Sequence, residues 1–272
     1  MTTTSYTPSG IAYDRAGPRG RLPVVLIHAG VADRRMWEPQ WSGLAAEHDV
    51  VRLDLRGYGE SADRPGGALS PVDDVLETLA QLGIDRCRLV GASFGAGVAV
   101  EVALTRPELV ESLLLVAPGG SLIAELTPEL GSFFAAERAA LADDDLDAAV
   151  EANLAAWVDG PRREPGAVDP AVRELVGVMQ RRAFELTADW DDLEEDELDP
   201  PALERLDEIR VPTLVLLGGL DLDAIHDTAR LVVEGMADAS LVEWPDAAHL
   251  PSLERPDDFL ALLRGWLTDS AD

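Results

Sequence analysis

A short run of apolar residues recurs along the chain, and most of these runs are followed by a stretch in which the apolar residues have helical spacing. The apolar runs that predict strands are residues 22–30, 48–57, 86–93, 110–120, 211–219 and 239–246. Helices are predicted at about 37–47, at 70–83 with Ser70 as N-cap and Gly83 as stop signal, at 94–107, near 226–236 and at 257–269. Apolar strands that alternate with helices are typical of a parallel sheet covered on both faces. We therefore expect an α/β fold, to which residues 11–17 add an antiparallel edge hairpin.

The alternation of strands and helices stops between residues 121 and 207, where the pattern is helical and contains no convincing strand. We interpret 121–207 as a helical cap, or lid, inserted after the strand at 110–120, so that 1–120 and 208–272 form the core of the fold. The end of this insertion, 189–199, is a run of acidic residues. Because such runs are usually solvated, we expect a hinge or an exposed helix face there and not a metal site.

The chain has 272 residues, enough for one large domain, and a formal net charge of −29. So acidic a surface repels nucleic-acid phosphates and anionic membranes, and neither is an expected partner. All 22 basic residues are arginine, and the lack of lysine excludes a lysine Schiff base and a P-loop. The acidic, lysine-free composition fits a high-GC genome and a salty habitat equally well. The first residues have no leader pattern, no apolar stretch is long enough to span a membrane, and Cys87 is the only cysteine. We expect a cytoplasmic protein.

The sequence "LVGASFGA" at 89–96 leads from strand formers into helix formers and places one serine between two glycines. In a sharp turn from strand to helix the central residue is strained, and the residues two positions away on either side must be small, as Gly91 and Gly95 are. The turn lifts the side chain of Ser93 off the sheet, and the first turn of the helix offers free N–H groups and a positive dipole end. Since this arrangement suits an attack that creates an oxyanion, we expect Ser93 to be a nucleophile.

A serine nucleophile needs a base, and the base needs an acid that orients it. Of the four histidines, His249 lies in a loop after the last predicted strand, where open parallel sheets build their sites, and we expect it to be the base. Two aspartates, Asp221 and Asp223, follow the preceding strand, and either fits the order of serine, acid and histidine. We prefer Asp221 because it comes first after the strand and is better placed to reach the imidazole.

The oxyanion of an acyl-transfer reaction needs two hydrogen-bond donors. One should be the backbone N–H of Phe94, which follows the expected nucleophile, and the other should come from the loop after the first buried strand. In that loop we favour the N–H of Gly30 and keep Ala29 as the alternative.

In these motifs and their order the chain resembles the α/β-hydrolase superfamily. The resemblance covers nearly the whole chain and rests on residues 28–30, 54–61, 91–95, 212–221 and 247–259. It implies an eight-stranded sheet with a helical cap between the sixth and seventh strands. The site residues that it implies are the nucleophile Ser93, the acid Asp221, the base His249 and the oxyanion donors Gly30 and Phe94. The chain is most similar to small capped esterases, enol-lactonases and cofactor-free haloperoxidases. Epoxide hydrolases and haloalkane dehalogenases of this fold have an aspartate in place of Ser93, which argues against both.

Together these residues predict a serine hydrolase that cleaves a small, largely apolar carboxylic ester or lactone and needs neither a metal nor an organic cofactor. The alternatives are an enzyme that breaks or forms a C–C bond or cyclises a metabolite with the same triad, and a non-hydrolytic ligand-binding protein. We call the loop at 28–37, which is expected to supply an oxyanion donor, the oxyanion loop. The residues expected to line the substrate pocket come from this loop and the cap, and they are Ala29, Met36, Trp37, Phe133, Phe134, Trp157, Met179 and Phe184.

Overall fold

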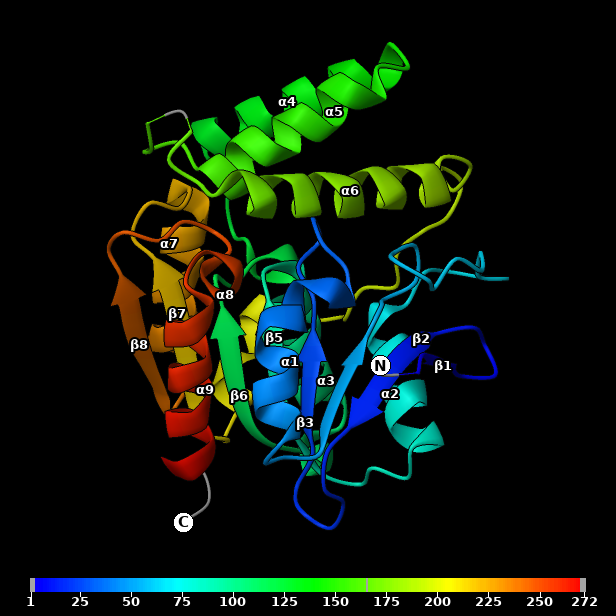
Figure 1. The fold of residues 1–272 in the computed structure, drawn as a ribbon, viewed down its shortest axis with the longest axis vertical. Helices are drawn as coiled ribbons and strands as arrows, with labels where there is room; N and C mark the ends of the chain where they lie inside the picture. The colour runs from blue at the N-terminus through cyan, green and yellow to red at the C-terminus, as the bar shows by residue number, and fades with distance from the viewer. Residues whose placement is uncertain (1–2, 165, 270–272) are drawn as a thin grey trace.

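An eight-stranded sheet with helices on both sides forms the lower part of the molecule in the computed structural model, which describes residues 3–164 and 166–269 (Figure 1). The strands are β1 (Ser5–Tyr6), β2 (Ala12–Ala16), β3 (Val24–Ile27), β4 (Val50–Leu53), β5 (Cys87–Ala92), β6 (Val110–Val116), β7 (Thr213–Gly218) and β8 (Ala239–Trp244). Their order in the sheet is β1-β2-β4-β3-β5-β6-β7-β8. The pairs of β2 with β1 and with β4 are antiparallel, and all other pairs are parallel. The expected α/β fold and the antiparallel edge hairpin are confirmed.

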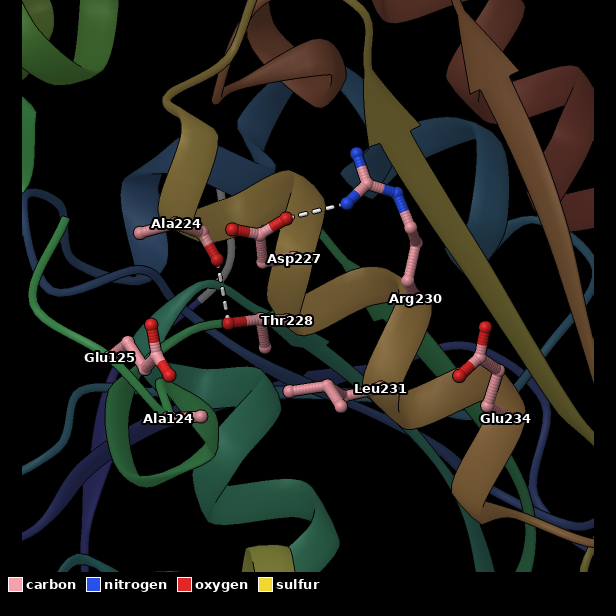
Figure 2. A pocket seen from close by; sticks show the side chains of 8 residues that line it. All are labelled: Ala124, Glu125, Ala224, Asp227, Thr228, Arg230, Leu231 and Glu234. Atoms are coloured by element: carbon pink, nitrogen blue, oxygen red, sulfur yellow. Dashed lines mark hydrogen bonds and ion pairs between the residues drawn. The ribbon is translucent and has the colours of Figure 1, made fainter.

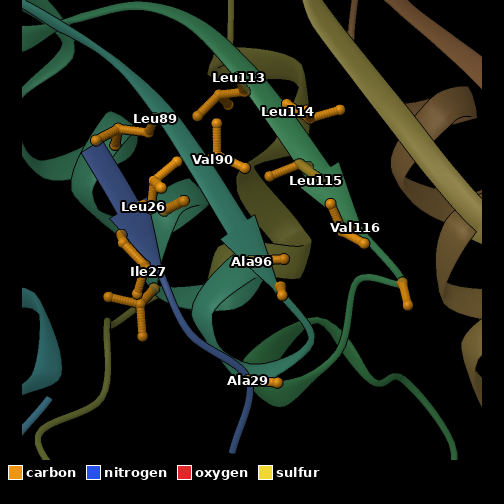
Figure 3. Packing of buried hydrophobic residues seen from close by; sticks show 14 of the residues in the cluster. Leu26, Ile27, Ala29, Leu89, Val90, Ala96, Leu113, Leu114, Leu115 and Val116 are labelled. Atoms are coloured by element: carbon orange, nitrogen blue, oxygen red, sulfur yellow. The ribbon is translucent and has the colours of Figure 1, made fainter. Parts of the chain in front are cut away.

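The centre of the sheet is almost entirely apolar. Every residue of β3 and β5 is buried, and Figure 3 shows the side chains of these strands packed beside those of β6. The side chains drawn there from the three strands include Leu26, Ile27, Leu89, Val90, Leu113, Leu114, Leu115 and Val116. Burying one Leu or Val side chain stabilises the folded chain by about 1.5–3 kcal/mol, so the pairing register of β3, β5 and β6 is strongly fixed. As a result, the residues that follow β3, β5 and β6 meet at one edge of the sheet.

Helices cover both faces of the sheet. Those of the core are α1 (Glu38–Ala45), α2 (Pro71–Gln81), α3 (Phe94–Thr105), α7 (Asp223–Gly235), α8 (Pro251–Glu254) and α9 (Pro256–Asp269). Helix α1 packs against α9, and α2 packs against α3. The ends of α2 are as expected: the side chain of Ser70 accepts a hydrogen bond from the N–H of Asp73, and Gly83 follows the helix with φ of 62°. Among the described residues, no helix combines the length and the apolar composition needed to cross a membrane.

The first part of the stretch between β6 and β7 is mostly helical, and its helices α4 to α6 lie above the carboxyl ends of the strands (Figure 1). It contains α4 (Pro128–Ala142), α5 (Leu146–Asn153), a π-helix (Leu154–Asp159) and α6 (Pro170–Thr187). Short 3-10 helices lie at Arg34–Trp37, Pro107–Leu109, Gly120–Leu122 and Ala202–Glu208. The helices α4 to α6 therefore face the edge of the sheet at which a site is expected.

The acidic run 189–199 is not helical, and most of its carboxylates are exposed as expected. It is more than a solvated hinge, however, because the ring of Trp190 is buried and the backbone pairs with the loop before α2. The N–H of Leu69 donates to the carbonyl of Glu194 at 2.8 Å, and the N–H of Asp196 donates to the carbonyl of Leu69 at 2.7 Å. These bonds attach the end of the helical insertion to the core.

Candidate active site

Ser93 lies at the sharp turn between β5 and α3, with φ of 51° and ψ of −116°. A Cβ on Gly91 would lie 2.2 Å from the carbonyl oxygen of Gly95, and a Cβ on Gly95 would lie 2.4 Å from that of His28. Both contacts are with backbone atoms that cannot move aside, so any larger residue at either position would open the turn. The N–H of Ser93 donates to the carbonyl of Val116 at 2.8 Å, which fixes the turn to the end of β6.

The structure brings Ser93, His249 and Asp221 into one hydrogen-bonded chain. His249 Nε2 is 2.7 Å from Ser93 Oγ, and His249 Nδ1 is 2.8 Å from Asp221 Oδ2. Both the imidazole and the carboxylate are almost fully buried. Because a carboxylate can only accept, the ring proton belongs on Nδ1, and Nε2 is left to accept the proton of the serine hydroxyl. This is the geometry that a nucleophile, a base and an orienting acid require.

Asp221, and not Asp223, reaches the imidazole. Asp221 also accepts the N–H of Leu222 at 2.8 Å through its other oxygen, so both carboxylate oxygens are held. Asp223 is the first residue of α7, and its exposed carboxylate is paired with Arg162. The geometry therefore favours the first of the two aspartates that the sequence offered.

The oxyanion loop is held by His28 at the end of β3. The N–H of Leu55 donates to His28 Nε2 at 3.0 Å, and Nδ1, which then carries the proton, is 2.9 Å from the carbonyl of Ala29. Complete burial lowers the pKa of His28, so the ring is neutral and both bonds persist near neutral pH. The ring also packs edge-on against Tyr58, with centroids 4.8 Å apart.

Of the two candidates for the second oxyanion donor, Gly30 is favoured by the contacts. The N–H of Ala29 is already used, because it donates to the sulfur of Met36 at 3.3 Å. A Cβ on Gly30 would lie 3.4 Å from Cβ of Phe94, so the two residues expected to donate are next to each other. The hydroxyl oxygen of Tyr58 would lie 3.7 Å from that Cβ on Gly30.

Aromatic residues of the helical insertion lie against the histidine. The rings of Trp157 and His249 have centroids 4.5 Å apart, and Phe133 packs edge-on against Trp157 at 5.1 Å. Phe134 lies 5.0 Å from Phe133 and is 40% exposed at the outer end of this row. Three of the expected pocket residues therefore form one row of rings in contact, from the partly exposed Phe134 to the imidazole.

The other expected pocket residues are less closely tied to the serine. Trp37 is fully buried and stacks on Phe259 of α9 with centroids 5.9 Å apart, a core contact that gives no support for a role in the pocket. On α6, Met179 is buried and Phe184 is partly buried, and their part in a pocket stays a prediction. The sulfur of Met36 supports the oxyanion loop from behind, as described above.

Sequence reasoning missed three neighbours of the site, which are Tyr58, Gly119 and Ile225. A Cβ on Gly119 would lie 3.4 Å from Ser93 Oγ and 3.5 Å from Cδ1 of Ile225, so Gly119 lies between Ser93 and α7. Gly119 follows β6 and Tyr58 follows β4. Because both lie just after the carboxyl end of a strand, the sequence could have marked them as neighbours of the site. Ile225 carries no comparable signal, since it looks like any core residue of an amphipathic helix.

A separate surface groove of about 320 Å³ runs along α7 (Figure 2). Its lining residues are Ala124, Glu125, Ala224, Asp227, Thr228, Arg230, Leu231 and Glu234. Figure 2 shows two local interactions in the groove: Arg230 is bound to Asp227 at 2.5 Å, and Thr228 donates to the carbonyl of Ala224 at 2.8 Å. Neither Ser93 nor His249 lines this groove, so it is distinct from the chemistry described above.

A mostly parallel sheet with a serine at the turn after its central strand, bonded to a buried histidine and aspartate, defines the class of α/β-fold hydrolases. The chain belongs to the alpha/beta hydrolase family, whose model matches residues 24–262. The protein is therefore an enzyme of the hydrolase class.

Its relatives include several named ester and lactone hydrolases. A pimeloyl-[acyl-carrier protein] methyl ester esterase of Pectobacterium carotovorum is 30% identical over 247 residues, which cover 88% of this chain and 92% of the esterase. A Rhizobium rhizogenes protein named for carbamate hydrolysis is 30% identical over 235 residues, covering 82% of this chain and 84% of that protein. Among solved structures, Est816, an N-acyl homoserine lactone degrading enzyme, matches with a TM-score of 0.76 at 26% identity, covering 97% of this chain and all of that one.

Proposed function

We propose that this enzyme cleaves a small, largely apolar carboxylic ester or lactone through an acyl-enzyme formed on Ser93. The observation that carries the proposal is the hydrogen-bonded chain from Asp221 through His249 to Ser93, buried at the carboxyl edge of the sheet. The ester and lactone hydrolases among the similar proteins support this substrate class.

In the first half of the reaction, Ser93 Oγ bonds to the substrate's carbonyl carbon while His249 Nε2 takes the serine proton. The carbonyl π electrons move onto the oxygen, and the backbone N–H groups of Gly30 and Phe94 stabilise the resulting oxyanion. Asp221 stabilises the imidazolium and keeps the ring in place. When the oxyanion collapses, the bond to the alkoxide breaks, and the alkoxide takes the proton from His249. An alcohol leaves, or stays tethered if the substrate is a lactone.

In the second half, water repeats the attack on the acyl-enzyme. His249 takes a proton from the water as its oxygen bonds to the acyl carbon, and the same donors hold the new oxyanion. The bond between the acyl carbon and Ser93 Oγ then breaks, and His249 returns the proton to the serine. The products are a carboxylic acid, or a hydroxy acid from a lactone, and the restored enzyme.

We assign 121–207 as a cap over this site and 1–120 with 208–272 as the catalytic core. The row formed by Phe134, Phe133 and Trp157 supports an apolar pocket under the cap, since it ends on the imidazole. We also propose that the enzyme is cytoplasmic, which a single cysteine, Cys87, without a disulfide supports. The net charge of −29 supports a small-molecule substrate over nucleic acid or an anionic membrane.

The proposal is tested by hydrolysis of p-nitrophenyl esters from acetate to octanoate, with Ser93→Ala as the control. We expect turnover by the native enzyme, with one preferred acyl length, and none above the buffer rate by the variant. Hydrolysis that persists in Ser93→Ala would refute the assignment of the nucleophile.

A further inference from the structure

The loop that follows the π-helix touches both of the loops that carry the acid and the base. Gly160 ends the π-helix with φ of 78°, and a Cβ there would lie 3.0 Å from Cβ of Ala248 and 3.1 Å from the carbonyl oxygen of Leu220. Ala248 precedes His249, and Leu220 precedes Asp221. A glycine at position 160 therefore lets the helical insertion come into backbone contact with the site.

Two arginines follow this glycine, and each binds one of the two loops. Arg162 donates to the backbone carbonyl of Asp221 and pairs with the carboxylate of Asp223. Arg163 donates to the backbone carbonyl of Asp246 at 3.0 Å and pairs with Glu254. The pair of Arg162 with Asp223 is partly exposed, but the side chains of Arg163 and Glu254 are only 10% and 7% exposed.

The carboxylate of Glu254 holds the backbone on both sides of the histidine. It accepts the N–H of Ala248 at 3.1 Å and that of Leu250 at 3.3 Å. These two residues flank His249, so the carboxylate fixes the peptide groups that carry the imidazole. The side chain of Glu254 is only 7% exposed, so a cation beside it stabilises its charge, and Arg163 supplies that cation from the helical insertion.

We propose that Arg163 and Glu254 form a positioning pair through which the cap holds His249 in line with Ser93. The inference rests on the proposed function only in taking His249 as the base. Without the guanidinium, the carboxylate of Glu254 is left as an uncompensated charge and turns toward water. That movement weakens its bonds to the N–H groups of Ala248 and Leu250, and the imidazole then loses its alignment.

The test compares Arg163→Gln, Glu254→Gln, the double variant and Arg163→Lys in ester hydrolysis. We expect Arg163→Gln to lower kcat by about 10- to 100-fold, the range that a small misplacement of a catalytic group produces, with KM changed by less than about twofold. Arg163→Lys should recover much of the rate because it keeps the buried cation. The double variant should lose less than the product of the two single losses, since the residues act as a pair.

The matched control is Arg181→Gln, which removes an ion pair with Asp147 between α6 and α5 and touches neither catalytic loop. It should keep the native kcat. All rates are compared at a temperature at which melting curves show each variant to be folded. A native kcat in folded Arg163→Gln, alongside hydrolysis that depends on Ser93, would overturn the positioning role and leave the proposed function intact.

A second readout does not depend on the natural substrate. An alkyl fluorophosphonate labels an activated serine, and its rate depends on the same alignment of His249 with Ser93. We expect the labelling rates to follow the same order, with Arg163→Gln slowed and Arg163→Lys and Arg181→Gln near native. If the native enzyme is labelled but hydrolyses no ester, the proposed substrate class fails while this ranking still decides the positioning role. Equal labelling rates in all folded variants would refute the positioning role of Arg163 and Glu254.

Discussion

The strained turn at Ser93 predicts that glycine is more stable than alanine at the position of the nucleophile. With φ of 51° and ψ of −116°, Ser93 lies in a region that costs a residue with a Cβ about 1–3 kcal/mol. Ser93→Ala keeps that cost, whereas Ser93→Gly removes it and pays about 0.4–1 kcal/mol for the greater freedom of glycine in the unfolded chain. Both variants lose the bond to His249, so their difference isolates the backbone strain.

The midpoints of those two ranges, about 2 and about 0.7 kcal/mol, give a net gain of about 1.3 kcal/mol for Ser93→Gly over Ser93→Ala. In a protein of this size that raises Tm by about 2–5 °C. Thermal melts of the two variants, followed by circular dichroism in the same buffer, measure the difference directly. Both variants should be inactive toward esters. A Tm for Ser93→Ala equal to or above that of Ser93→Gly would refute the claim that the turn stores strain.

Three further predictions concern the acid, the turn and a buried carboxyl group. Asp221→Asn should lower kcat for ester hydrolysis by about 10⁴-fold, as loss of an orienting acid does, and Asp223→Asn by less than about tenfold; the reverse ranking would move the acid. Gly91→Ala should yield little folded protein, since its Cβ would lie 2.2 Å from a backbone oxygen, and a native melting curve would contradict the turn geometry. Burial raises the pKa of Asp74 to about 6, above its ordinary value of 3.8, so the folded chain holds the extra proton and this group's contribution to stability falls as the pH rises from about 4 to about 6. The Tm of Asp74→Asn minus that of the native protein should therefore increase across that window, and a constant difference would show that folding does not raise the pKa of Asp74.

The parts of the structure that local chemistry controls were predictable from the sequence. Uninterrupted apolar strands alternating with helices allow little besides a parallel sheet covered on both faces, and strands β3 to β8 follow that pattern. The spacing of Gly91, Ser93 and Gly95 predicted a turn too tight for a Cβ at either glycine, and the structure has such a turn. The position of His249 after the last strand was informative for a similar reason, because strand ends converge in space even when they are distant in sequence.

Contacts between the helical insertion and the core were not predictable in the same way. Arg162 and Arg163 look like ordinary surface residues of an acidic protein, and only the path of the loop shows that their partners are the carbonyl of Asp221 and the buried carboxylate of Glu254. Long side chains can reach many partners, so sequence spacing alone does not select one. For the same reason the sequence grouped Trp37 with Trp157 as pocket residues, whereas the structure places one against α9 and the other against His249.

The most direct test of the central claim is to trap the acyl-enzyme. Native enzyme mixed with excess p-nitrophenyl ester and quenched in acid within milliseconds to seconds should gain the mass of one acyl group. Peptide mapping should place that group on Ser93, and Ser93→Ala should gain none. A stoichiometric acyl group on another residue, or an equal gain of mass by Ser93→Ala, would contradict the account.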